Sequence, residues 1–189
     1  MTDDVRRRLA AIPALTGTPP TLDLERLPAE PTALFLDWLE DAVTAGVPEP
    51  RTTTLATADA DGIPDARLLI LKDVGERGWA FASTASSRKG EQLADNPAAA
   101  LSFWWQPLTR AVRVRGRAVE GTPEESAADL AARSPQAQSL VADGDWRLWW
   151  VRPDRIEFWQ GSPDRKHLRI VYTRTDDTWS REILTADGS

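Results

Sequence analysis

The first strong pattern along the chain is helical. From Pro31 onward, apolar residues recur at steps of three and four, at Leu34, Phe35, Trp38, Leu39, Ala42 and Val43. This spacing places them on one face of a helix, and Gly46 and Pro48 predict where that helix ends. Residues 1–30 are rich in proline, threonine and charge and have no sustained period. We expect them to form a partly ordered N-terminal arm.

The rest of the chain is dominated by short apolar runs separated by turn residues, a pattern typical of strands. The predicted strands are residues 52–58, 66–74, 79–83, 98–105, 110–120, 148–151, 155–160, 169–175 and 178–184. Asp61-Gly62 marks a hairpin turn between the first two strands. Short helices are expected after Ser87, ending near Asn96, and over residues 123–133, whereas residues 134–145 have an irregular pattern.

Many short strands with few helices between them favour an antiparallel sheet that closes, or nearly closes, into a barrel. The expected fold class is therefore mainly β with flanking helices. We expect a single domain over residues 31–189. A chain of 189 residues, 41% of them hydrophobic, can bury one core but is too short for two full domains.

Composition excludes several kinds of site. The chain has no cysteine, which rules out disulfides and thiolate chemistry and suits a reducing, cytoplasmic compartment. His167 is the only histidine, so a metal centre or a serine triad is disfavoured. No apolar run is long enough to predict a membrane span. The net charge of -6 argues against general nucleic-acid binding, which depends on neutralising phosphates.

One segment has the residue types of a phosphate site. Ser86-Ser87-Arg88-Lys89-Gly90 places hydroxyls and cations at a predicted helix start. Free backbone amides and the helix dipole favour an anion at such a position. The same residues also fit a serine-capped helix with solvated charges, so both interpretations stay open on local sequence alone.

Two further segments carry candidate binding residues. The apolar strand 66–72 has Arg67 and Lys72 near its ends, and in an ideal strand these positions face opposite sides and would serve different ligands. A core strand with solvated terminal charges is the alternative. In segment 157–169, alternation puts Arg165, His167 and Arg169 on one face if the return strand begins as early as Arg165, which would make a pocket wall for an anionic group and a planar ring. A satisfied surface histidine is the alternative there.

Together these segments resemble the pyridoxamine 5'-phosphate oxidase family in order and spacing, from about Pro31 to Leu184. The matching stretches are Arg67 to Lys72, Ser87-Arg88-Lys89, Asn96-Pro97, the strand from Arg110 to Gly116, and Glu157-Phe158-Trp159-Gln160-Gly161 followed by Arg165, His167 and Arg169. The resemblance implies an FMN-binding split β-barrel that works as a homodimer. FMN would lie in two clefts at the subunit interface, each built from both chains.

Carried over by position, the resemblance implies a cofactor site and a substrate site. Arg67, Arg88 and Lys89, beside Ser87, would hold the FMN phosphate through charge-assisted hydrogen bonds. The flavin would be lined by the backbone of Leu68, Leu69, Ile70 and Leu71, up to Lys72, and by Ala82 and Ser83. Trp159 and Arg169 would complete the cofactor site. Lys72 would contact the substrate phosphate, and Arg165 and His167 would lie over the substrate as the catalytic residues.

The implied reaction is hydride transfer from a substrate carbon to flavin N5, followed by reoxidation with dioxygen, as in pyridoxal phosphate biosynthesis. Pyridoxine or pyridoxamine 5'-phosphate is the leading substrate hypothesis. A non-phosphorylated ring, as in the related oxidases of phenazine biosynthesis, is an alternative. A non-catalytic flavin-binding module is another.

The chain departs from the family pattern in three places. Lys166 and Leu168 flank the histidine where the family has leucine and aspartate. The strand Arg110-Ala111-Val112 lacks a glutamine that faces the flavin. The segment from Asp129 to Asp145 is shortened.

The shortened segment allows two alignments. Without a gap, Arg133 is kept for the substrate phosphate, while Asp129 and Ala137 replace a tyrosine and a serine. With an earlier gap, Gln138-Ser139 keeps an FMN contact. We favour the second alignment, and Arg133 stays open as a substrate residue. In either case an acid at position 129 would repel a nearby phosphate.

Overall fold

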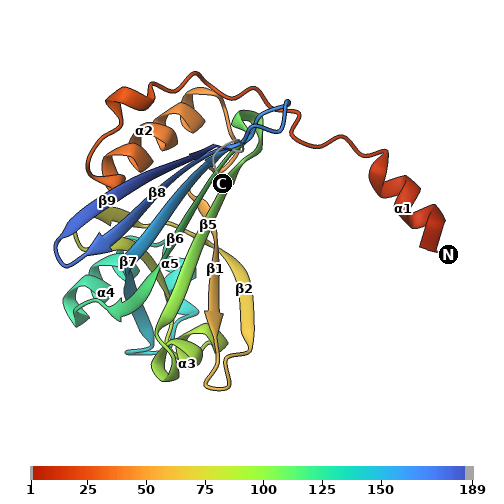
Figure 1. Cartoon of the computed structure of the whole chain (residues 1–189). Coiled ribbons are helices and arrows are strands. Elements are labelled where there is room, and N and C mark those ends of the chain that lie inside the picture. The colour runs from red at the N-terminus through yellow and green to blue at the C-terminus, as the bar shows by residue number, and fades with distance from the viewer. Residues whose placement is uncertain (1, 186–189) are drawn as a thin grey trace.

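The structure is a computed structural model and describes residues 2–185. Within these residues the strands form one antiparallel sheet in the order β2-β1-β5-β6-β7-β4-β3, with β8 paired to β7 and β9 to β8. The strands are β1 Thr52–Ala58, β2 Pro64–Ile70, β3 Asp73–Gly75, β4 Gly78–Thr84, β5 Ala98–Trp105, β6 Arg110–Glu120, β7 Trp146–Gln160, β8 Leu168–Thr175 and β9 Thr178–Thr185. The sheet curls into a split barrel (Figure 1), which confirms the predicted mainly β, antiparallel fold.

Helices flank the sheet. They are α1 Thr2–Ala10, α2 Pro31–Thr44, α3 Arg88–Asp95, α4 Pro123–Ala131 and α5 Pro135–Ser139, with 3-10 turns at Leu24–Arg26 and Gln106–Leu108. The predicted helix from Pro31 is confirmed as α2. The prediction that residues 134–145 are wholly irregular is wrong, because α5 lies there. The Ser134 side chain caps α5 by accepting from the Ala137 amide, and Pro135 occupies its first turn.

The chain changes its partner strand at Leu71 and Lys72. The Leu71 amide donates to the Arg51 carbonyl (3.0 Å), whereas the Lys72 amide donates to the Ala80 carbonyl (2.8 Å). β2 pairs with β1, and β3 pairs with β4. The single strand predicted over residues 66–74 is therefore wrong in this respect, because an apolar run does not reveal which neighbour each residue pairs with. Lys72 lies at the crossing between the two sides of the barrel.

β7 is one strand of 15 residues, rather than the two strands predicted at 148–151 and 155–160. Its first half pairs with β4 and its second half with β8, while β6 follows it along most of its length. Pro153 lies beside a bulge between Arg115 and Gly116, a position where a proline is tolerated in a sheet. A Cβ on Gly116 would lie 2.0 Å from the Arg152 carbonyl oxygen, so this close approach requires glycine.

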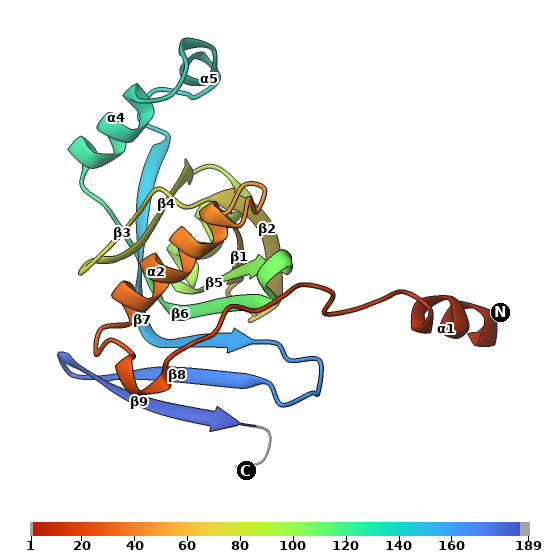
Figure 2. The ribbon, with the colours of Figure 1, turned by 90° about the horizontal axis from the view of Figure 1, so that it is seen from above.

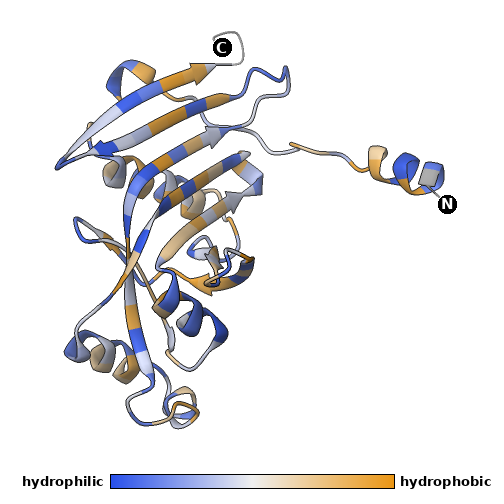
Figure 3. Cartoon of the chain, turned by 60° about the horizontal axis from the view of Figure 1, so that its bottom comes forward, coloured by the Kyte–Doolittle hydropathy of each residue, from blue (hydrophilic) through white to orange (hydrophobic). Residues whose placement is uncertain are grey.

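The apolar face of α2 packs against the inner side of the barrel. The Phe35 ring lies 5.0 Å from Phe103, 5.8 Å from Trp79 and 6.0 Å from Trp105, measured between ring centroids. Along β1 and β5, every second residue is buried, and Figure 3 shows the matching alternation of hydrophobic and hydrophilic residues along several strands. The period-two pattern in the sequence therefore reports a real inner face.

A buried arginine joins α2 to the sheet. Arg110, at the start of β6, is 1% exposed, and its guanidinium lies 4.1 Å from the centre of the Trp38 ring. It donates to Gln160 Oε1 (2.8 Å) and forms an ion pair with Asp41 (2.6 Å). Burial lowers the pKa of Arg110, and the Asp41 carboxylate opposes that shift. This residue therefore serves the packing of the helix.

The segment before α2 runs over the barrel and is held mainly through its carbonyl groups. The side-chain amide of Gln160 donates from Nε2 to the Pro20 carbonyl (3.2 Å), and the Tyr172 hydroxyl donates to the Pro28 carbonyl (2.7 Å). α1 projects away from the rest of the chain (Figures 1 and 2). None of the helices within residues 2–185 has the length and apolar character needed to cross a membrane.

Candidate functional site

The predicted phosphate-binding residues lie together where β2 meets the start of α3. We call Arg67, Ser87, Arg88 and Lys89 the cationic cradle. Arg67, on β2, reaches toward α3 and donates to Gln92 Oε1 (3.1 Å) and to the Thr57 hydroxyl. Lys89 Nζ donates to Ser87 Oγ (3.1 Å), and Ser87 caps α3. Two chain segments far apart in sequence thus place three cations at one helix start.

The cradle is partly withdrawn from water. The Arg67 side chain is only 21% exposed. Burial lowers the pKa of Lys89, and the nearby positive charge of Arg67 lowers it further. Gln92 is buried, and its Nε2 has no hydrogen-bond partner within the described residues. An anion bound here would relieve the charge repulsion and could accept from unsatisfied donors.

Asp65 is a charged member of this neighbourhood that the sequence analysis missed, as it missed Thr57 and Gln92. Its Oδ2 lies 3.0 Å from Arg67 and 3.2 Å from Nε of Arg88, so one carboxylate oxygen bridges two cradle cations. Positions 65 and 67 fall on the same face of β2 because side chains repeat every two residues. That spacing was the available signal. The Arg88 side chain is 72% exposed, which makes it the least enclosed cation of the cradle.

The residues predicted to line a flavin surround the cradle. Leu68 and Ile70 are 71% and 42% exposed and face outward from β2, whereas Leu71 is buried. Leu69 is partly buried against the core. On β4, Ala82 is half-buried and Ser83 is buried, with its Oγ 3.5 Å from Ser87 Oγ. The exposed apolar residues Leu68 and Ile70 thus follow Arg67 along β2, with their side chains on the opposite face of the strand from the Arg67 side chain.

Lys72 belongs to a second group of residues, which we call the Lys72 cluster: Lys72, Asp129, Arg133 and Trp146. Lys72 Nζ lies 3.0 Å from Asp129 Oδ1. The Trp146 indole donates from Nε1 to Asp129 Oδ2 (2.9 Å), and the Arg133 guanidinium lies 4.2 Å from the centre of the Trp146 ring. The structure therefore brings the predicted substrate residues Lys72 and Arg133 together around an aspartate and a tryptophan.

Gln138 and Ser139 lie in α5, away from the cradle. This helix follows α4 and lies at one end of the molecule (Figure 2). Gln138 Nε2 donates to the carbonyls of Ala131 (3.2 Å) and Arg133 (2.7 Å), and Ser139 Oγ donates to the Gln136 carbonyl (2.9 Å). Both side chains thus donate to local backbone carbonyls of the α4–α5 segment. In this chain the pair holds that short turn together.

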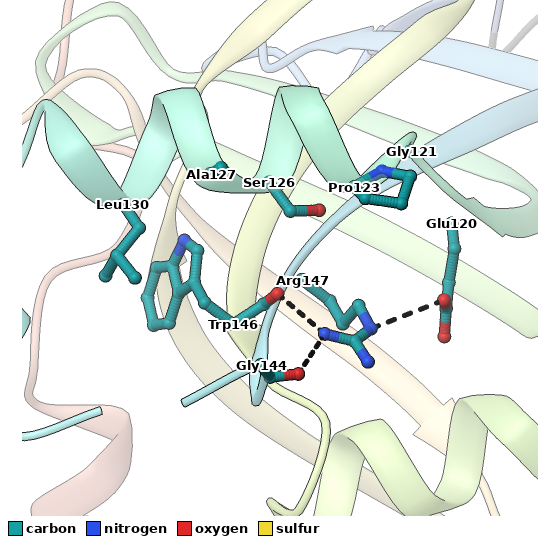
Figure 4. A pocket seen from close by; sticks show the side chains of 9 residues that line it. All are labelled: Glu120, Gly121, Pro123, Ser126, Ala127, Leu130, Gly144, Trp146 and Arg147. Carbon is teal, nitrogen blue, oxygen red and sulfur yellow. Dashed lines mark hydrogen bonds and ion pairs between the residues drawn. The ribbon is translucent and has the colours of Figure 1, made fainter. Parts of the chain in front are cut away.

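A cavity of about 450 Å³ lies beside the Lys72 cluster, between α4 and the start of β7. It is lined by Glu120, Gly121, Pro123, Ser126, Ala127, Leu130, Gly144, Trp146 and Arg147 (Figure 4). Arg147 donates to the carbonyls of Gly144 and Trp146 and lies 3.6 Å from Glu120. Trp146 is shared, because it lines the cavity and its indole N–H bonds Asp129.

The third group lies along the outer ends of β5, β7 and β8. We call Trp104, Trp159 and His167 the aromatic row. The Trp159 ring centroid lies 5.0 Å from that of His167 and 6.2 Å from that of Trp104. Trp104 is 48% exposed, and the sequence analysis missed it. An exposed tryptophan at the end of a predicted strand was the signal that could have found it.

The imidazole of His167 is oriented by the backbone. The Ser162 amide donates to His167 Nδ1 (3.1 Å), so the neutral ring carries its proton on Nε2, which is left to face a ligand. Arg165, in the preceding turn, has a φ of 65° and is exposed. Arg169 pairs in register with Trp159 and is also exposed.

The cradle and the aromatic row do not form one site within a single chain. Arg67 is on β2 and Trp159 is on β7, and the sheet order places β1, β5 and β6 between those strands. Within the described residues, no hydrogen bond, ion pair or ring contact joins the cradle cations to the aromatic row.

Two family models match this chain. Residues 39–160 match the family described as Pyridoxamine 5'-phosphate oxidase. Residues 146–186 match the Pyridoxine 5'-phosphate oxidase C-terminal dimerisation region, which indicates a homodimer. That second match contains both Trp159 and His167.

Similar curated proteins carry the same name. A pyridoxine/pyridoxamine 5'-phosphate oxidase of Paraburkholderia phymatum is 38% identical over 186 residues, which is 82% of this chain and 88% of that protein. The protein of the same name from Burkholderia multivorans is 40% identical over 185 residues, covering 82% of this chain and 86% of the relative.

Solved structures share the fold. PhzG from Burkholderia lata 383, in complex with tetrahydrophenazine-1-carboxylic acid, has a TM-score of 0.82 at 25% identity and covers 89% of this chain and 100% of its own. A pyridoxamine 5'-phosphate oxidase-related, FMN binding protein from Nostoc punctiforme has a TM-score of 0.62 at 19% identity, over 87% and 98% of the two chains. From the family matches, the relatives and the shared fold, the chain belongs to the pyridoxamine 5'-phosphate oxidase family.

Proposed function

We propose that this protein is an FMN-dependent oxidase that converts the aminomethyl or hydroxymethyl group of pyridoxamine or pyridoxine 5'-phosphate to an aldehyde. The observation that carries the proposal is the cationic cradle, in which Arg67 and Lys89 share a partly buried site at the start of α3. The names of the curated relatives support the substrate. The absence of cysteine supports a cytoplasmic location.

The cradle fits the phosphate of FMN. Its three cations and the bridging Asp65 leave a net charge of about +2, which matches the charge of about -1.5 to -2 on a phosphate monoester at neutral pH. Burial lowers the pKa of Lys89, and the positive charge of Arg67 lowers it further. Gln92 Nε2 supplies a buried donor without a partner. A phosphate would satisfy these groups through charge-assisted hydrogen bonds.

We place each cofactor between two protomers. One protomer would supply the cradle, the backbone from Leu68 to Leu71 and the Ala82-Ser83 step. Its partner would supply Trp159, Arg169, Arg165 and His167. The matched dimerisation region, which contains Trp159 and His167, supports this arrangement.

The chemistry divides between cofactor and protein. FMN held by the cradle would supply a hydride acceptor for the substrate carbon, and dioxygen would take up that hydride and the proton lost from the substrate's oxygen or nitrogen and leave as hydrogen peroxide; with the amine, water would hydrolyse the resulting imine and release ammonia. The protein orients and encloses the reactants. His167 would donate from Nε2 to the substrate, because the Ser162 amide occupies Nδ1. Arg165 would add positive charge beside it, and Lys72 would face the distal end of the substrate ring.

The absorption spectrum of freshly purified protein tests the cofactor first, since bound oxidised flavin is yellow. Anaerobic addition of pyridoxamine or pyridoxine 5'-phosphate then tests the reaction, and we expect the flavin absorbance to bleach and to return with oxygen. A colourless protein that takes up no FMN from excess would overturn the cofactor assignment. A yellow protein that no amine or alcohol reduces would leave the flavin-binding module as the function.

A second candidate keeps the reaction and changes the substrate to a ring without phosphate. The ion pair between Lys72 and Asp129 favours it, because the lysine expected to meet a substrate phosphate already has a counter-ion. The similarity to PhzG is consistent with this candidate. Assays of flavin reduction with phosphorylated and unphosphorylated substrates separate the two.

A further inference from the structure

The Lys72 cluster holds an internal anion in a fixed position. The Asp129 side chain is 14% exposed, and each of its oxygens has a partner: Lys72 Nζ at 3.0 Å and the Trp146 indole nitrogen at 2.9 Å. The Lys72 side chain is 31% exposed. Asp129 is therefore a buried, doubly bonded carboxylate, and Lys72 is its counter-ion.

Helix α4, which carries Asp129, is tied down at its start. Thr122 and Glu125 form a capping box, in which each residue bonds the backbone of the other. Glu125 also pairs with Arg77, and Ser126 Oγ accepts from the Leu148 amide of β7 (3.1 Å). These contacts fix α4 against the sheet one turn before Asp129. The helix therefore holds the backbone of Asp129 in place, and a rotation of the Asp129 side chain away from Lys72 would also break its hydrogen bond with Trp146.

This geometry opposes a phosphate at Lys72. A phosphate oxygen bonded to Lys72 would lie about 2.8 Å from Nζ, on a group that already has Asp129 at 3.0 Å. Two anions would then share one lysine at close range in a partly buried site, where like charges repel strongly. If Lys72 turned to the phosphate instead, Asp129 would be left buried with the Trp146 N–H alone. Either route costs binding energy.

A hydroxyl or ammonium group meets no such opposition. It can donate to an oxygen of Asp129 while the ion pair with Lys72 stays in place. Arg133 does not change this balance, since its guanidinium lies on the Trp146 ring. We propose that Asp129 is a specificity-determining residue that neutralises Lys72, so that the enzyme prefers a ring substrate with a hydroxyl or ammonium substituent over the corresponding phosphate ester. This inference rests on the second candidate of the proposed function, in which a ring substrate without phosphate lies beside Lys72.

The test compares ligand binding to the FMN-loaded protein. Dissociation constants for pyridoxal and pyridoxal 5'-phosphate are measured by titration calorimetry for the wild type, Asp129→Asn and Asp143→Asn. Asp143 is exposed and lies in the same connecting segment, so its substitution makes the same change in net charge away from Lys72. Asp129→Ser is a second variant, and the FMN content and melting temperature of each protein establish that it is folded.

We expect the wild type to bind pyridoxal at least as tightly as pyridoxal 5'-phosphate. Asp129→Asn and Asp129→Ser should shift the ratio of the two constants toward the phosphate ester by about tenfold or more, which corresponds to about 1.4 kcal/mol. Asp143→Asn should leave the ratio unchanged. The ratio of kcat/KM for pyridoxamine 5'-phosphate to that for pyridoxamine should move in the same direction.

The inference is overturned if the wild type binds the phosphate ester more than tenfold tighter, if it binds neither aldehyde, or if the Asp129 variants shift the ratio no more than Asp143→Asn. The binding ratio needs no turnover, so it tests the inference separately from the proposed reaction. A yellow protein with the expected ratio, whose flavin no vitamer reduces, would refute the proposed function alone. Flavin reduction with an unchanged ratio would refute the inference alone.

Discussion

Replacing Lys89 by methionine should weaken FMN binding without destabilising the FMN-free protein. Methionine keeps most of the apolar stem but removes the ammonium group. In the free protein that group is unfavourable, because burial and the charge of Arg67 lower its pKa. A bound phosphate would supply the missing counter-charge. The same side chain should therefore oppose folding slightly and favour the cofactor.

The sign and size of both effects follow from the site. A lysine whose pKa is lower in the folded chain than in the unfolded chain destabilises the fold while it is protonated, and this cost fades as the pH rises toward the ordinary value of 10.5. At pH 7 its removal should leave the melting temperature of the FMN-free protein unchanged or raised. A hydrogen bond to a charged group contributes about 1.5 to 3 kcal/mol. FMN affinity should therefore fall by about 10-fold to about 150-fold.

Quenching of FMN fluorescence on titration into the FMN-free protein measures the affinity, and calorimetric unfolding measures the stability. Arg152→Met is a suitable control, since Arg152 is exposed on β7 and its loss changes the net charge equally. An unchanged dissociation constant for Lys89→Met would refute the assignment of the cradle. Lower stability of the FMN-free variant would refute the electrostatic argument.

Three other substitutions test separate parts of the structure. Arg88→Ala should weaken FMN binding by only about 0.2 to 1 kcal/mol in the same titration, the range for exposed ion pairs, because this side chain is 72% exposed and pairs with Asp65; a loss as large as that of Lys89→Met would contradict this. His167→Asn should leave FMN bound, as its spectrum would show, but lower kcat, and wild-type kcat would remove His167 from the active site. Gly116→Ala should lower the free energy of unfolding in urea by about 1 to 3 kcal/mol, the range for overpacking, because the new Cβ would lie 2.0 Å from the Arg152 carbonyl oxygen; an unchanged midpoint would contradict the close approach.

Local patterns predicted most elements of this fold but not how they join. The three- and four-residue spacing from Pro31 marked α2 correctly, since one face of that helix is buried. The apolar run from residue 66 to 74 predicts one strand, because hydropathy carries no information on which strand each residue pairs with. In the structure the chain changes its partner strand at Leu71. β7 passes through Pro153 without ending because the bulge at Gly116, far away in sequence, accommodates the proline.

Most residues of the candidate site could likewise be predicted, but not all of their contacts. The grouping of Arg67 with Lys89 could be predicted, because both belong to segments with a known order and spacing in the family. The contacts of the counter-ions Asp65 and Asp129 could not be predicted. Asp65 bridges two cations through a geometry that only β2 and α3 together create. Asp129 was recognised as an unusual acid, but its contact with Lys72 depends on the docking of α4 against the barrel.

The crossing of the chain at Leu71 and Lys72 has a consequence for how this site can vary. Arg67 and Lys72 belong to one short extended stretch, whose far end is pinned by bonds to the Arg51 and Ala80 carbonyls. At about 3.3 Å per residue, the two cations are held about 16 Å apart along the chain. The length of this stretch sets the distance between the two ligand positions. Inserting or deleting one residue would change the length of this stretch and turn the side chains beyond the change to the opposite face. Evolution can therefore adjust the ligands here by substitution but not by a change of length.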